Sequence, residues 1–170
     1  MKRVVELLRL IKSCESIEGR KKLQKVVHIL QCNGNDFGFR YSFYHHGPFS
    51  ADLKNEIDFL VSSDFVCEVE KAKGDYTQYV YSLNSSCLTV MKPMGLEIEP
   101  SWSDFAKKLS KRPAKILESI STILYLFDLD LSESEVRDEF KRLKPHLIDK
   151  LESSLAEAQT LREPVSNTSG

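Results

Sequence analysis

The spacing of apolar residues changes twice between positions 19 and 63, and the rest of the chain extends from this stretch. The spacing is helical at Leu23, Val26, Val27 and Leu30, alternates at Phe37, Phe39, Tyr41, Phe43 and His45, and is helical again at Leu53, Ile57, Leu60 and Val61. A period of 3.6 predicts a helix and a period of two predicts a strand with one buried face. We therefore expect a helix over residues 18–32, a strand over 37–45 and a helix that ends near residue 63.

Flanking segments extend this unit on both sides. An amphipathic first helix, with basic residues on its polar side, precedes it and should end between residues 13 and 17. Two β-prone segments, residues 65–70 and 76–83, flank a glycine-containing tip that holds Lys71 and Lys73. Helices followed by a hairpin with a basic tip favour a winged-helix-like unit over residues 1–92.

Residues 93–162 are predicted to form a helical region that packs on this unit. Ser132 and Glu135 match a capping box that opens one of these helices. In a last helix the inward stripe would be Ile148, Leu151, Leu155 and Ala158. Residues 163–170 are polar, lack periodicity and are expected to be a disordered tail. The predicted fold class is mainly α with a small antiparallel sheet (α+β).

One C-terminal helix, around residues 116–127, is apolar over more than one face. Its apolar residues are Ile116, Leu117, Ile120, Ile123, Leu124, Tyr125, Leu126 and Phe127. A helix that is apolar nearly all round needs burial on two sides. Either other helices of the chain cover the second side, or the C-terminal helices form a homodimer.

Composition excludes several classes of protein. The chain has 170 residues, a net charge of −1 and no apolar run of the roughly 18 residues that cross a bilayer. We expect a cytoplasmic protein without a membrane partner. Its four cysteines lack the close pairing of zinc sites, so a reducing compartment would keep them as thiols.

Basic residues concentrate in the N-terminal part, where nine Lys and Arg outnumber four acids over residues 1–50. The candidate nucleic-acid-binding residues are Arg20, Lys21, Lys22 and Lys25 on the second helix and Lys71 and Lys73 on the hairpin. A basic run of this kind is also common as a solvated helix face. The third helix is a poorer candidate, because Asp52, Glu56 and Asp58 would face the phosphates.

Catalytic chemistry is not indicated by any pattern in the chain. Nucleophile-elbow, phosphate-loop, dinucleotide-binding and His-Glu-x-x-His motifs are all missing. His45 and His46 are adjacent, but neighbouring strand residues point to opposite faces, and a third ligand would have to be His28 or Cys67. We predict no catalytic residue, no metal site, no cofactor and no enzymatic activity.

Three sequence segments carry a family resemblance. The sequence Gly19-Arg20-Lys21-Lys22-Leu23-Gln24-Lys25, followed by Tyr41-Ser42-Phe43-Tyr44 and Gly47-Pro48-Phe49-Ser50, resembles the YwgA family of small prokaryotic proteins over roughly residues 1–90. More distantly it resembles the Panacea antitoxin domain, which implies neutralisation of a partner toxin. The resemblance implies no catalytic residue.

Two functions follow from these patterns. One is a non-enzymatic regulatory protein of winged-helix-like type that acts on DNA. The other is a protein-interaction module of a toxin-antitoxin or defence system without DNA contact, for which the uneven charge would suit a charged partner protein.

Overall fold

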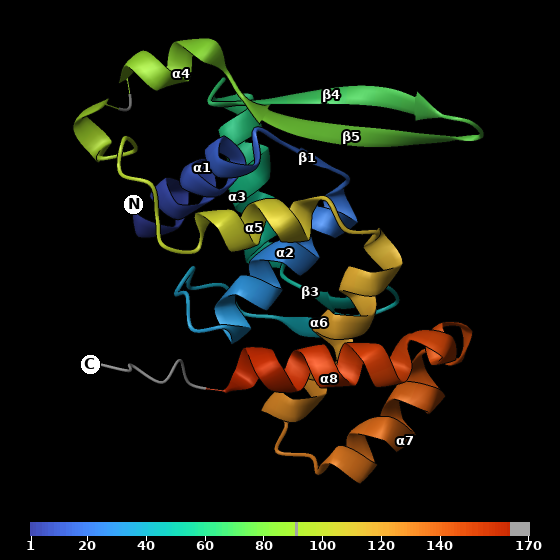
Figure 1. Cartoon of the computed structure of the whole chain (residues 1–170). Helices are drawn as coiled ribbons and strands as arrows, with labels where there is room; N and C mark the ends of the chain where they lie inside the picture. Colours follow the sequence, from blue (N-terminus) through green and yellow to red (C-terminus); the bar gives the residue numbers. More distant parts are fainter. Residues whose placement is uncertain (91, 164–170) are drawn as a thin grey trace, which may run out of the picture.

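The computed structural model describes residues 1–90 and 92–163 (Figure 1). The helices are α1 (Lys2–Cys14), α2 (Arg20–Cys32), α3 (Ala51–Ser62), α4 (Ser85–Val90), α5 (Ser103–Ser110), α6 (Ala114–Asp128), α7 (Glu133–Leu143) and α8 (Leu151–Arg162), with the 3₁₀ turns η1 (Lys92–Met94) and η2 (Pro145–Lys150). The strands are β1 (Ser16–Glu18), β2 (Ser42–Tyr44), β3 (Gly47–Phe49), β4 (Val66–Lys73) and β5 (Tyr76–Leu83). The protein is mainly α-helical with small antiparallel sheets, which confirms the predicted fold class.

Capping residues start two of the helices, and the capping box at Ser132 is the one predicted above. The Ser50 side chain accepts a hydrogen bond from the Leu53 amide at 3.2 Å and opens α3. At α7, Ser132 accepts from the Glu135 amide while the Glu135 carboxylate accepts from the Ser132 amide, which is a complete capping box. Both caps satisfy amides that have no partner within the helix.

The larger sheet contains a strand that the sequence did not predict. In the described part of the chain its order is β1-β5-β4, and β1 pairs antiparallel with β5 through Ile17 opposite Tyr81. Residues 13–17 were expected only to end the first helix. A strand of three residues has too few positions for a detectable period, and pairing with β5 determines it. The β4–β5 hairpin is confirmed, but its tip is only Gly74 and Asp75, so Lys71 and Lys73 lie in β4.

The aromatic segment is only partly a strand, and the prediction of a strand over residues 37–45 was wrong in extent. Strand β2 covers residues 42–44 and pairs with β3. Phe37 and Phe39 are buried as predicted, although their backbone is irregular. Gly38 has a φ of +76°, and the Gln31 side chain bonds both the amide and the carbonyl of Phe39. A helix side chain thus replaces the partner strand there, and His45, predicted to point inward, is exposed.

Helices α2 and α6 form the centre of the molecule. Every residue of α2 from Leu23 to Leu30 is buried, and α6 contacts α2, α7, α8 and β3. The apolar residues of α6 are therefore covered by the chain itself. The homodimer was predicted because a second apolar side of this helix needed cover, and other helices of the chain supply that cover. The homodimer therefore stays a prediction without this argument.

The two ends of the molecule are built from different parts of the chain. The β4–β5 hairpin projects at one end, and α7 and α8 lie at the other (Figure 1). The boundary between residues 92 and 93 stays a prediction, and one cluster of buried apolar side chains includes residues from both sides of it. Within the described residues, no helix has the length and apolar composition needed to cross a bilayer.

The C-terminal stripe needs one correction. Ile148 lies in η2 and is 48% exposed, whereas its neighbour Leu147 is buried. Helix α8 begins only at Leu151, because the 3₁₀ turn interrupts the spacing from which the stripe was predicted. Of the predicted tail, residues 164–170 lie outside the described residues.

Candidate functional site

Two polar residues of α2 hold the segment that leads into α3. This segment, residues 45–50, includes β3 and is called the turn below. Gln24 donates to the Ser50 carbonyl and accepts from the Ser50 amide, each at 2.9 Å. The neighbouring Lys25 donates from Nζ to the Pro48 carbonyl at 2.6 Å. Gln24, Lys25 and Ser50 are all buried, so water cannot replace these bonds. We call this set of bonds the α2–turn contact.

A second buried lysine holds the other side of the same turn. Lys144 donates to the His45 carbonyl at 2.9 Å and forms an ion pair with Glu118 at 2.6 Å. Burial lowers the pKa of Lys25 to about 8; Glu118 opposes this shift, and the Lys144 and Lys21 charges add to it. Two buried ammonium groups thus share one neighbouring carboxylate, and the wall around the turn is electropositive.

Gly47 is required at the first position of β3, directly after the tip of the β2–β3 hairpin. Its φ is +86°, a region that residues with a side chain rarely adopt. A Cβ at this position would lie 3.0 Å from Thr122 Oγ1 and 3.8 Å from Lys25 Nζ. The turn therefore approaches α6 closely only because residue 47 has no side chain.

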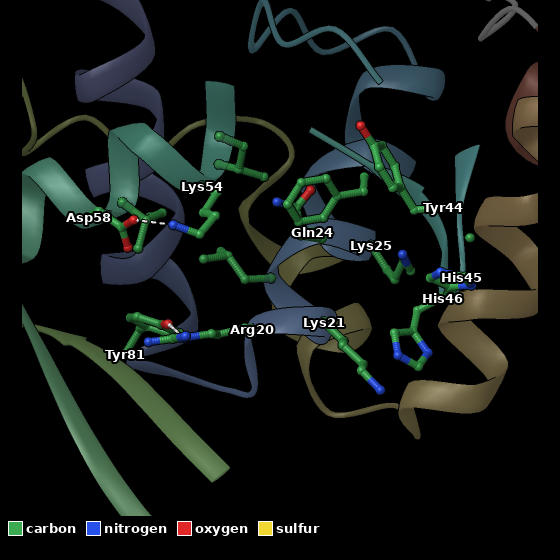
Figure 2. Close-up of a pocket in the computed structure, with 15 residues that line it drawn as sticks. Arg20, Lys21, Gln24, Lys25, Tyr44, His45, His46, Lys54, Asp58 and Tyr81 are labelled. Carbon is green, nitrogen blue, oxygen red and sulfur yellow. Dashed lines mark hydrogen bonds and ion pairs between the residues drawn. The ribbon is translucent and has the colours of Figure 1, made fainter. Parts of the chain in front are cut away.

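The turn, α2 and α3 enclose a pocket of about 350 Å³ (Figure 2). This volume falls in the range of small-molecule sites, roughly 300–1,000 Å³. Its apolar walls are Leu23, Phe49, Leu53 and Ile57, with the rings of Tyr44 and Tyr81 at the sides. Such walls favour an apolar group as the ligand body.

Basic side chains predominate around this pocket. They are Arg20, Lys21, Lys25 and Lys54, together with His45 and His46. Asp58 also lines the pocket, but its carboxylate already accepts from Lys54 at 2.6 Å. Burial is the main cause that lowers the pKa of His46, and the charge of Lys21 is the second. The lowered pKa favours the neutral form of His46 near pH 7.

The structure separates the predicted nucleic-acid-binding residues of α2. Arg20 donates to the Tyr81 hydroxyl at 3.0 Å and pairs with Glu68 at 3.2 Å. The Lys22 ammonium donates to the Ser110 carbonyl at 2.9 Å. The expectation that Lys25 lies on a solvated face was wrong, since only 2% of it is exposed. Only Lys21 of these four is an exposed side chain without a described ion-pair partner.

The two hairpin lysines also differ from each other. Lys73 pairs with Glu18 of β1 at 3.6 Å. Lys71 is exposed and engages no described carboxylate in an ion pair. The six residues therefore do not form one continuous surface of free cations, and whether any of them binds nucleic acid stays a prediction.

Possible metal ligands occur in a different place from the one considered in the sequence. His45 and His46 line the pocket, whereas the donor atoms of His28, Cys32 and Asp128 lie within 4.8 Å of one another. Burial raises the pKa of Cys32 to about 12; Asp128 adds to this shift, and Arg162 opposes it. The spacing of four residues between His28 and Cys32 was a detectable signal, but Asp128 is too distant in sequence to be paired with them.

The fold and the pocket define a small α+β protein with a ligand-sized apolar cavity bordered by cations. The chain is 32% identical over 135 residues to the "Uncharacterized protein YwgA" of Bacillus subtilis (strain 168). The matched region covers 79% of this chain and 81% of that protein. It belongs to the YwgA family, as its motifs predicted. No family model matches the chain. The resemblance to the Panacea domain stays a prediction.

Buried Lys25 should make stability depend on pH. Its pKa is about 8 in the folded protein, against an ordinary value of 10.5. Between these values the unfolded chain binds a proton that the folded protein does not, so stability rises with pH. Relative to Lys25→Met, the wild-type free energy of unfolding should increase by on the order of 3 kcal/mol across this interval, measured by urea unfolding. The exposed variant Lys115→Met should follow the wild type, and parallel profiles for wild type and Lys25→Met would contradict the assignment.

Proposed function

We propose that this protein is a non-enzymatic binding protein with a regulatory role, and that the pocket between α2, α3 and the β2–β3 hairpin is its binding site. The ligand is a small molecule with an apolar body and one anionic group. The observation that carries the proposal is the combination of apolar walls with an excess of basic side chains around them. The cytoplasm stays the expected compartment.

The charge balance of the pocket supports an anionic group on the ligand. Asp58 is neutralised by Lys54, and Arg20 is partly neutralised by Glu68. Lys21 is exposed near His46, and Lys25 adds a cation in the wall (Figure 2). An anion at this side gains from both lysines, while a cation of the same shape is repelled.

The contacts among the lining residues support a non-enzymatic role. In the part of the chain that the structure describes, the side chains lining the pocket bond one another only as Arg20 with Tyr81 and Lys54 with Asp58 (Figure 2). Neither pair is a nucleophile with its general base. Lys25 uses its ammonium to hold the turn.

Calorimetric titration with two amphiphiles of equal chain length tests this proposal. Decanoate should bind with one site per chain, and decyltrimethylammonium should bind at least about tenfold more weakly. Lys21→Glu should weaken decanoate binding by about tenfold, because one attractive charge becomes repulsive.

Lys115→Glu is the matched control, since Lys115 is exposed on α6 and does not line the pocket. It should leave decanoate binding unchanged. Equal binding of the two amphiphiles, no binding of either, or the same effect from both lysine variants would overturn the proposal.

DNA-linked regulation is the second candidate function, and the order of elements favours it. The elements follow one another as α1, β1, α2, α3 and the β4–β5 hairpin, with the small β2–β3 hairpin inserted between α2 and α3. The strand order of the larger sheet is β1-β5-β4. This order supports the winged-helix-like interpretation. Contact with phosphates would rest on Lys21 and Lys71, because Lys22, Lys25 and Lys73 have partners within the chain.

Retention on immobilised duplex DNA tests this second function. With two free lysines, binding should be weak, and the logarithm of affinity should fall with the logarithm of salt concentration with a slope of about −2. Lys71→Glu should abolish retention, and Lys115→Glu should not. Passage of the wild type without retention at low salt would contradict DNA binding, and it would favour the alternative of a protein-interaction module.

A further inference from the structure

Three potential metal ligands from two helices meet at the C-terminal ends of α2 and α6. His28 and Cys32 lie one helical turn apart on α2, and Asp128 is the last residue of α6. Cys32 Sγ lies 3.6 Å from His28 Nε2 and 3.7 Å from Asp128 Oδ2. None of the three lines the pocket described above.

These distances match the spacing of ligands around a tetrahedral metal ion. With a zinc–sulfur bond of about 2.3 Å and zinc–nitrogen or zinc–oxygen bonds of about 2.0 Å, neighbouring ligand atoms lie roughly 3.6 Å apart. Both distances from the sulfur already have this value. The ligands would therefore need only small side-chain adjustments to share one ion.

The surroundings of His28 fix the ring for such a role. Its Nδ1 lies 2.7 Å from the hydroxyl of Ser121, and both residues are buried. In the tautomer that donates from Nδ1 to this hydroxyl, the other nitrogen is available to a metal. Here that nitrogen is Nε2, and its described partner is the thiol sulfur of Cys32, which is a weak hydrogen-bonding group.

We propose that His28, Cys32 and Asp128 bind a divalent ion of the zinc class, with water as the fourth ligand. The thiolate and carboxylate together neutralise the ion, and Cys32 releases its proton to solvent on binding. A sulfur–nitrogen–oxygen set favours zinc over magnesium or calcium, which take oxygen ligands. Asp128 is exposed, so water can reach the open position.

The ion would join the ends of the two central helices. Residues 28–32 on α2 and Asp128 on α6 would be linked by bonds additional to the apolar packing between these helices. Binding to the folded chain alone raises the temperature of unfolding. Stability is therefore a second readout, independent of absorption.

Cobalt serves as the spectroscopic probe for this site. Titration of the purified protein with Co²⁺ should give one equivalent bound, with a sulfur-to-cobalt charge-transfer band and the strong visible bands of tetrahedral geometry. Zn²⁺ should displace it. Cys32→Ser should remove the charge-transfer band, whereas Cys67→Ser, a change at a half-buried cysteine outside the cluster, should retain it.

Asp128→Asn provides a variant at an exposed position, where the fold is not at risk. It should weaken Co²⁺ binding by at least about tenfold and abolish the increase in unfolding temperature that Zn²⁺ gives the wild type. Absence of the charge-transfer band from the wild type, its persistence in Cys32→Ser, or an unchanged affinity in Asp128→Asn would overturn the proposal. The three side chains would then be only a hydrogen-bonded chain.

Discussion

The α2–turn contact is the interaction on which the rest of the structure depends. Gln24 satisfies both backbone groups of Ser50, and Lys25 satisfies the carbonyl of Pro48. Ser50 in turn caps α3, so the start of that helix is fixed against the middle of α2. Each bond is buried, and an unpaired buried polar group costs about 1–3 kcal/mol. Two of the three sequence segments that resemble the family, those around Leu23-Gln24-Lys25 and Gly47-Pro48-Phe49-Ser50, are thus joined by this one contact.

The same contact also forms the pocket and its charge. It holds β3 close to α2 and α6, with Gly47 at the closest approach to Thr122. The space that stays open between α2, the hairpin and α3 is lined by apolar groups. Lys25 is held in the pocket wall by the bond that fixes the turn, so under the proposed function one side chain both holds the structure and attracts the ligand. This explains how the motif contributes to the proposed binding site through its structural contacts.

Much of the fold could be predicted from the sequence, because helix periodicity and caps are local signals. The apolar α6, the Ser132 capping box and the β4–β5 hairpin are examples. Strand β1 could not, since its pairing with Tyr81 and its neighbours is determined by tertiary contact. The burial of Lys25 could not be predicted either. Its partner is the backbone carbonyl of Pro48, and every residue type has such a carbonyl. Similarly, Cys32 and Asp128 are 96 residues apart, and only the packing of α2 on α6 brings them together.

Amide exchange at Ser50 tests the α2–turn contact most directly. In the wild type this buried amide donates to Gln24 Oε1 and should exchange only when the region opens. Gln24→Leu removes the acceptor and should accelerate its exchange by at least about tenfold, while α6 amides keep their protection and the matched variant Gln159→Leu on α8 has no effect. Unchanged protection of Ser50 in Gln24→Leu would contradict the account, because the turn would then be held without the contact.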